Sequence, residues 1–477
     1  MLVVGGVIGS GIFRKSGIMA EQLGSPILLL VIWLVAGLVT LLGVLSLAEL
    51  AAAMPETGGF YVYYERLYGR FAAFLYGWAG FAVIQTGALA AVCYVFAEHA
   101  GQLFPIPVLF DVDDTFRIHL PLLGDIQPFH ELGVKLLAAS MLIGLSVVNY
   151  LGVRFGGGLQ NLVTLVKAGA MAAMLLLVFM PPSAGDFSNL TMVAAQQPKG
   201  WALWTACAGA LQGAFWAYEG WNLVASVAGE VKEPQRNLPR ALIWGMGLVT
   251  LIYLAMNLAY THVLPIDEMA GSKLVAAEVA ERCMTHGGRW VAVAVMVSTF
   301  GAANAIILTS ARVYFSMGQR GVFPSWLGRV DRRFHTPGWS ILVQALWGVA
   351  LLFSGTFDTL TNTLIFVSLT FYAAAALGVI LLRRREPNLV RPYRVPGYPW
   401  VPALFVVFIV FYLALTLRND FAHYSEAVAA GRPAMINSLF GLVLVVAGTP
   451  IYWFCSWLRK RAQRQSPSPP FGGRGPG

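Results

Sequence analysis

The sequence predicts an all-α integral membrane protein with twelve transmembrane helices. Of its 477 residues, 57% are hydrophobic and only 12% are charged, whereas a soluble domain carries about 25% charged residues. Apolar runs such as ILLLVIWLVAGLVTLLGVLSL at 27–47 reach the roughly 20 residues that a helix needs to cross the hydrocarbon core. A glycine-rich stretch interrupts the first of these runs, which predicts a broken helix at membrane depth.

Twelve stretches of the chain are expected to span the membrane. Several are longer than a perpendicular helix needs, which indicates tilt or continuation beyond the hydrocarbon. The segment 459–477 that follows is basic and then rich in Pro, Gly and Ser, which predicts a disordered cytoplasmic tail. Met1 already stands inside the first stretch, so we expect the natural start to lie upstream. The expected spans lie near 1–23, 26–54, 71–104, 133–153, 159–180, 201–230, 239–263, 287–317, 338–356, 359–382, 400–417 and 436–458.

The basic residues predict the orientation of these spans. With the N-terminus inside, the loops and tail on that side carry 21 Lys and Arg, against 8 on the opposite side. Because positive residues concentrate on the cytoplasmic side, both termini are expected in the cytoplasm of a multi-pass protein of the plasma (inner) membrane. The net charge of +9 follows from this topology, and no nucleic-acid partner is needed to explain it.

Two expected spans carry features that break a helix. The first has GSG at 9–11, and the sixth has a carboxylate beside a glycine, Glu219–Gly220, at its centre. A glycine inside a helix costs roughly 0.5–1 kcal/mol relative to alanine, and close helix packing is the alternative reason for such glycines. Interrupted helices at corresponding positions of two halves indicate a transporter with its site near the midplane.

Five motifs, spread over most of the chain, carry a family resemblance. The chain resembles the amino acid–polyamine–organocation superfamily, and within it the L-type amino acid transporter branch. The resemblance implies a LeuT-type fold with a first five-helix repeat at 1–180, an inverted repeat at 201–382 and two further helices at 400–458. It also implies amino acid transport by alternating access, often as obligatory exchange. The motifs are GSGIF (9–13), VTLVKAGA (163–170), FWAYEGWN (215–222), GEVKEPQRNLPRA (229–241) and RPYRVPGYPWVP (391–402).

The opened helix ends are expected to bind the two charges of an amino acid. A helix N-terminus favours an anion and a C-terminus a cation, so the N–H groups around Ser10, Gly11 and Ile12 should receive the α-carboxylate. The carbonyl groups on the other side of each break should receive the α-ammonium. The residues concerned are Val7 and Ile8 in the first span and Trp216 and Ala217 in the sixth. Gly220, at the second break, is a further candidate substrate-binding residue.

Three side chains are expected to gate or couple transport. Trp216 aligns with the family's aromatic gate over the substrate. The resemblance also implies that the Lys167 ammonium supports the carbonyls of the broken first helix, where sodium-coupled relatives hold a cation; this predicts sodium-independent transport. Snorkelling of Lys167 is the alternative. Glu219 is left open between contact with the substrate, proton transfer, and a pair with Lys167 or Arg14.

Other polar residues are weaker candidates. Asn304 in the eighth span, and Gln85 and Thr86 in the third, are candidate lining groups, with hydrogen bonds between helices as the alternative. Arg14 and Lys15 follow the break on the outward half, where they either attract substrate carboxylates in an external vestibule or form an exposed basic pair. The segment 55–69 is expected to form an internal gate loop.

The leading hypothesis is sodium-independent exchange of neutral amino acids; a proton-coupled permease, or a carrier of cationic amino acids or polyamines, stays open. The seven histidines include no metal-ligand spacing, so neither an enzyme nor a cofactor is expected. Animal L-type transporters join a heavy subunit through a cysteine in the loop after the third span. Here the loop 105–132 has no cysteine, so no disulfide-linked heavy subunit is expected, and the partners are the amino acid substrate and the lipid bilayer.

Overall fold

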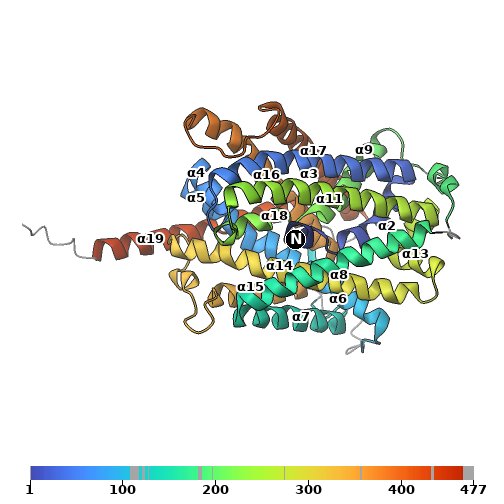
Figure 1. The fold of residues 1–477 in the computed structure, drawn as a ribbon, viewed down its shortest axis with the longest axis horizontal. Helices are drawn as coiled ribbons and strands as arrows, with labels where there is room; N and C mark the ends of the chain where they lie inside the picture. Colours follow the sequence, from blue (N-terminus) through green and yellow to red (C-terminus); the bar gives the residue numbers. More distant parts are fainter. Residues whose placement is uncertain are drawn as a thin grey trace, which may run out of the picture.

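Long helices that lie side by side form the molecule (Figure 1). The computed structural model describes residues 2–107, 118–120, 124–126, 128–180, 185–195, 197–272, 274–354, 357–430 and 435–465. The helices α3, α11 and α14 run across the width of the view, and α19 extends beyond the others at one end (Figure 1). We refer to this as the α19 end.

The secondary structure is almost entirely helical. The α-helices are α1 Leu2–Val7, α2 Gly11–Leu23, α3 Pro26–Ala53, α4 Phe60–Tyr68, α5 Arg70–Ala79, α6 Gln85–Leu103, α7 Leu132–Leu151, α8 Val153–Phe179, α9 Trp201–Tyr218, α10 Leu223–Ser226, α11 Pro234–Val263, α12 Ile266–Gly271, α13 Val275–Cys283, α14 Gly287–Gln319, α15 Gly338–Ser354, α16 Phe357–Arg385, α17 Trp400–Ala429, α18 Asn437–Val446 and α19 Thr449–Gln465. A π-helical turn, η1 Gly80–Ile84, joins α5 to α6. The 3₁₀ turns are η2 Phe187–Thr191, η3 Ala228–Glu230 and η4 Ser325–Gly328, and the strands are β1 Ile118–Leu120 and β2 Gly124–Ile126.

Nine helical stretches within the described residues are long and apolar enough to cross a membrane. Large apolar side chains such as Trp244 and Leu251, 77% and 67% exposed, lie on the outside, as a lipid-facing surface requires. The chain is therefore an integral membrane protein. Of the other three expected spans, 338–356 is the 17-residue helix α15. The remaining two, 1–23 and 201–230, are the ones that the sequence predicts to be broken, and each is divided into two helices.

The structure departs from the expected boundaries in three places. The expected span 400–417 continues as α17 to Ala429, and α19 continues to Gln465, seven residues into the segment expected to be a disordered tail. Both extensions carry charged and other polar residues, so hydropathy ends before the helix does. Residues 466–477 lie outside the described residues. The short antiparallel pair β1–β2, with Ile118 opposite Ile126, is an exception to the expected all-α class.

Close helix packing builds the framework around the two broken helices. The helix α3 packs along α11, α14 packs along α6, and α2 packs along α9. At the α3–α11 contact a Cβ on Gly37 would lie 2.5 Å from the Thr250 side chain, so only glycine permits this approach. The first interrupted helix, α1, packs against α8, α11 and α14. These three helices carry polar groups to the breaks.

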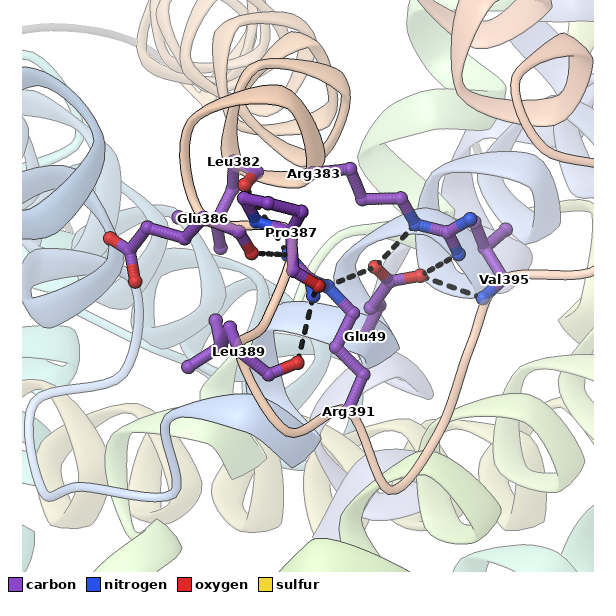
Figure 2. Close-up of polar contacts among 8 residues, drawn as sticks. All are labelled: Glu49, Leu382, Arg383, Glu386, Pro387, Leu389, Arg391 and Val395. Atoms are coloured by element: carbon purple, nitrogen blue, oxygen red, sulfur yellow. Dashed lines mark hydrogen bonds and ion pairs between the residues drawn. The ribbon is translucent and has the colours of Figure 1, made fainter.

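A buried carboxylate ties α3 to the connection between α16 and α17 (Figure 2). Glu49 of α3 is 2% exposed and accepts hydrogen bonds from Arg383 Nε at 2.8 Å and from the Val395 backbone N–H at 2.8 Å. Arg391 Nε lies 3.3 Å from the same carboxylate, while its other nitrogens donate to the Leu389 and Glu386 carbonyls. This cluster anchors part of the RPYRVPGYPWVP motif at the α19 end of the bundle.

Candidate functional site

The first break separates α1 from α2 over residues 8–10. Helix α1 ends at Val7 and α2 begins at Gly11, where the glycines of GSG predict the interruption. A Cβ on Gly11 would lie 2.4 Å from the Ala217 Cα atom, so α2 approaches α9 at a distance that only glycine allows. The first N–H groups of α2 and the last C=O groups of α1 have no partners within their own helices.

The second break separates α9 from α10 and lies against the first. Helix α9 ends at Tyr218, α10 begins at Leu223, and Gly220 between them has a φ of 105° that favours glycine. A Cβ on Gly220 would lie 2.7 Å from the Gly6 carbonyl oxygen. The two interrupted helices therefore contact each other at their breaks, as the sequence predicts for a shared site.

Side chains from α8 and α14 hold the carbonyl groups that the first break exposes. The Lys167 Nζ atom donates to the Gly5 and Ile8 carbonyl oxygens, both at 2.6 Å, and Lys167 is 1% exposed. Ser298 Oγ donates toward the carbonyls of Ile8 at 3.2 Å and Gly9 at 3.1 Å. The contact expected of Lys167 is confirmed, and snorkelling toward the membrane surface does not describe this buried lysine.

A tyrosine from α11 bridges the two breaks. The Tyr253 hydroxyl lies 3.1 Å from the Val7 carbonyl oxygen and 3.0 Å from that of Ala217. Both of these carbonyls belong to helix ends that the breaks expose, one on each interrupted helix. Tyr253 is fully buried, so its hydroxyl is placed to fix the distance between the two ends.

One cavity, with an empty volume of about 450 Å³, lies at the junction of the breaks. The centre of a water molecule can reach about 30 Å³ of it, so it is narrow. Among the expected site residues, the lining includes Val7, Ser10, Gly11, Trp216, Glu219 and Gly220, whereas Ile8, Ile12, Ala217 and Asn304 stand outside it. The other lining residues are Gly6, Gly9, Ile84, Gln85, Ala88, Val92, Leu223, Ala302 and Ile306.

Polar atoms face this cavity. Ser10 Oγ is buried and has no hydrogen-bond partner in the part of the chain that the structure describes. The Glu219 carboxylate accepts a hydrogen bond from the Tyr372 hydroxyl of α16, and Glu219 also lines a second, smaller cavity with Thr40 and Tyr218. A carboxylate and a hydroxyl beside opened helix ends are groups that can bind a zwitterion.

Several sequence expectations about single residues need correction. Glu219 bonds to Tyr372 rather than to Lys167 or Arg14; Lys167 holds backbone carbonyls, and Arg14 forms an ion pair with Glu98. Asn304 lies outside the cavity because it packs against α7, where its Oδ1 accepts a hydrogen bond from Asn149 Nδ2 at 2.8 Å. Lys15 is buried, 5% exposed, rather than standing in an open vestibule.

The two candidates in the third span, Gln85 and Thr86, differ in their surroundings. Gln85 lines the cavity, whereas the Thr86 hydroxyl donates back to the Phe81 carbonyl at 2.5 Å. The segment 55–69 contains the helix α4 and packs on α10, the second half of the broken sixth span. There the Gly58 N–H donates to the Ser226 carbonyl at 3.1 Å. This contact agrees with the location expected of a gate loop, and its gating role stays a prediction.

Sequence reasoning missed three residues that organise the site: Tyr253, Ser298 and Tyr372. Each stands on a long helix that carries several other hydroxyl side chains, so the sequence alone does not single it out. A buried tyrosine hydroxyl usually finds a partner, which is a general signal. With 17 tyrosines in the chain, that signal selects none of them without the tertiary contacts.

Comparison with known proteins places the chain among transporters. A family model described as "Amino acid permease" matches residues 1–448. The chain is 30% identical over 456 residues to the large neutral amino acids transporter small subunit 2 of Mus musculus, covering 95% of this chain and 78% of that protein. It is 29% identical to the serine/threonine exchanger SteT of Bacillus subtilis (95% and 94% covered), and 31% identical to the Asc-type amino acid transporter 1 of Mus musculus (96% and 80%). These relatives are transporters rather than enzymes, and the match extends over both interrupted helices and the cavity between them. The chain therefore belongs to the amino acid permease family.

Proposed function

We propose that this protein is a secondary active transporter that exchanges neutral amino acids across the membrane by alternating access, without sodium. The observation that carries the proposal is the cavity at which two interrupted helices meet. The α2 N-terminus and the α1 and α9 C-termini supply partial charges of opposite sign, matching the α-carboxylate and α-ammonium of an amino acid. The names of the relatives, which are amino acid transporters and an exchanger, support the same class of substrate.

The sodium independence rests on Lys167. Its ammonium bonds to the Gly5 and Ile8 carbonyl oxygens, which are the kind of oxygen ligands that a sodium ion would use in an unwound helix. A fixed positive charge at this position repels a second cation and satisfies the carbonyls in every step of the cycle. Lys167 thereby takes the structural place of a coupling ion.

Trp216 is the proposed gate over the substrate. It lies at the C-terminal end of α9, two residues before the helix stops, and lines the cavity. An aromatic side chain next to a flexible break can move with the break and cover the ligand. In the same proposal the twelve spans form two inverted repeats, 1–180 and 201–382, followed by 400–458, with both termini in the cytoplasm.

The chain is proposed to transport without a disulfide-linked subunit. The loop 105–132 contains no cysteine in its sequence. Cys93 and Cys455 are buried, so neither presents a thiol to a partner.

The deciding experiment is uptake into proteoliposomes. Purified protein would be reconstituted without sodium, with labelled amino acids outside and either buffer or unlabelled amino acid inside. Uptake that requires the internal amino acid is the expected result. Equal uptake into empty vesicles would overturn exchange, and absence of uptake from the whole panel would overturn amino acid transport.

A second candidate, a proton-coupled permease or a carrier of cationic amino acids or polyamines, is favoured by one observation. Glu219 places a carboxylate in the cavity wall, hydrogen-bonded to Tyr372. A carboxylate here can carry a proton or bind a cationic side chain. Uptake by Glu219→Gln, measured with and without an acid-outside gradient and with lysine as well as leucine, tests this. Unchanged gradient dependence and unchanged lysine uptake would rule the second candidate out.

A further inference from the structure

We infer that Gln85 binds the polar side chain of the transported amino acid, and that a π-helical turn before it sets its direction. This inference rests on the proposed function, and it names the substrate class: amino acids with a hydroxyl or carboxamide side chain. It is carried by the geometry of η1, by the groups that hold η1 and by the surroundings of the Gln85 amide.

The π turn inserts one extra residue into the helix of the third expected span. The Gln85 N–H donates to the Gly80 carbonyl, five residues back instead of the usual four. All five residues of η1 are buried. Because an α-helix turns about 100° per residue, one inserted residue turns every later side chain by that angle. The turn therefore decides which face of α6 meets the cavity.

Side chains from three positions hold the π turn. The Gly80 carbonyl accepts a hydrogen bond from the Tyr314 hydroxyl at 3.2 Å, and the Ala82 carbonyl accepts one from Trp347 Nε1 at 3.1 Å. The Phe81 carbonyl between them accepts from the Thr86 hydroxyl. Three successive carbonyls thus receive side-chain donors, which repairs the backbone bonding that a π turn disturbs inside a membrane.

Aromatic packing adds to these bonds. The Phe81 ring stands edge-on to Tyr314, with ring centroids 5.3 Å apart, and stacks with Trp347 at 6.2 Å. Tyr314 belongs to α14 and Trp347 to α15, so two other helices fix the turn. The register change is therefore a maintained feature of the fold.

The π turn presents the side-chain amide of Gln85 to the cavity. Gln85 lines the cavity with Glu219 and Ser10, and its amide makes no hydrogen bond to the residues that the structure describes. The other lining residues of η1, α6 and α14 are apolar: Ile84, Ala88, Val92, Ala302 and Ile306. A buried amide without a partner costs free energy, and a ligand that binds it recovers that cost.

The chemistry of this wall defines the substrate. The helix ends across the cavity complement the two charges common to all amino acids, which leaves the α6 wall for the variable side chain. A carboxamide can both donate to and accept from a hydroxyl or another amide. Threonine should therefore be preferred over valine, which has the same shape without the hydroxyl.

The first test compares threonine with valine in the exchange assay. Wild-type protein is expected to have the lower KM for threonine. Gln85→Leu should raise the KM for threonine roughly threefold to tenfold and leave that for valine unchanged or lower, as expected for loss of one hydrogen bond. Gln212→Leu is the matched control, because Gln212 of α9 bonds to the Asn362 carbonyl and is not part of the cavity lining. An equal change for both substrates in Gln85→Leu would overturn the inference.

The second test addresses the π turn as a positioning device. Tyr314→Phe and Trp347→Phe remove the donors to Gly80 and Ala82 while keeping rings against Phe81. The double variant should lose the threonine preference while valine exchange continues. Tyr260→Phe is the control, because its buried hydroxyl has no hydrogen-bond partner among the described residues. A double variant that keeps the full preference would show that the turn does not position Gln85.

A labelling experiment gives an independent readout that does not depend on flux. With Cys93, Cys207, Cys283 and Cys455 replaced by alanine, Gln85→Cys should react with a small thiol reagent, and saturating threonine should slow the reaction. Thr86→Cys should not be protected, because Thr86 does not line the cavity. If wild type exchanges amino acids but threonine does not protect Gln85→Cys, this inference is wrong and the proposed function stands. If wild type exchanges no amino acid, the proposed function itself is overturned.

Discussion

The Nζ atom of Lys167 lies 2.6 Å from the carbonyl oxygen of Ile8, the first residue after α1 ends. The same atom lies 2.6 Å from the Gly5 carbonyl, so one side chain from α8 closes the helix end that the break opens. A lysine buried to this degree needs partners, and here the partners are backbone oxygens rather than an acidic side chain.

Lys167→Met should therefore abolish sodium-independent exchange and lower the melting temperature. It leaves the Gly5 carbonyl without its side-chain donor and the Ile8 carbonyl with the Ser298 hydroxyl alone, and an unsatisfied buried group costs about 1–3 kcal/mol. Lys199→Met is the control, because Lys199 is exposed. Both are measured by uptake and by thermal unfolding in detergent; full exchange by Lys167→Met would contradict the role assigned to the ammonium.

Tyr253→Phe should slow exchange more than it lowers stability. The hydroxyl joins carbonyls on both interrupted helices, so its loss frees their relative position, and we expect a fall in exchange rate of about tenfold, equivalent to about 1.4 kcal/mol. Tyr260→Phe, on the same helix, removes a hydroxyl without a partner in the described structure and should leave the rate unchanged. Equal rates for the two variants would refute the bridging role.

Gly11→Ala should block transport. Its Cβ would lie 2.4 Å from the Ala217 Cα atom and 2.5 Å from the Ala217 Cβ atom, so the start of α2 would have to move away from α9. Gly144→Ala on α7 is the control, because a Cβ there meets no atom within 4 Å. The measurement is exchange normalised to reconstituted protein; wild-type exchange by Gly11→Ala would mean that the close approach is not required.

Glu49→Gln should lower the free energy of unfolding more than Glu386→Gln does. Removing a buried carboxylate leaves Arg383 and Arg391 without their partner, and breaking such a pair costs about 3–5 kcal/mol. Glu386→Gln removes a more exposed partner, that of Arg66, and should cost at most about 1 kcal/mol. The melting temperatures of the two variants are measured by thermal unfolding. A smaller decrease for Glu49→Gln than for Glu386→Gln would contradict the role assigned to the buried carboxylate.

Asp331 should make a pH-dependent contribution to the free energy of unfolding. Its carboxylate, in the loop before α15, accepts from the backbone N–H groups of Phe334 and Arg333, both at 2.9 Å, and these bonds lower the pKa of Asp331. Since the folded pKa is below the unfolded value of about 3.9, the stabilisation is present at neutral pH and is lost as pH falls below that value. The melting temperatures of wild type and Asp331→Asn should differ at pH 7 and converge toward pH 3. A constant difference across that range would show that the charge of Asp331 makes no contribution.

The class of protein, the family and the places where two helices break all follow from composition and short motifs. Composition and apolar run length identify a membrane protein, because hydrocarbon tolerates few charges. The glycines at 9–11 and Glu219–Gly220 locate the breaks because they are local features of the chain. The family motifs then singled out Lys167 as the side chain that supports the broken helix.

Which polar side chains reach the site depends instead on how the helices pack. Tyr253 and Tyr260 lie on the same helix, yet one hydroxyl bridges the two breaks and the other has no hydrogen-bond partner among the described residues. Asn304 was expected to line the cavity and instead bonds to Asn149. Gln85 faces the cavity because a π turn, held by Tyr314 and Trp347, changes the register of α6. The direction of a side chain depends on helix rotation and on contacts from distant segments, and neither is written in the local sequence.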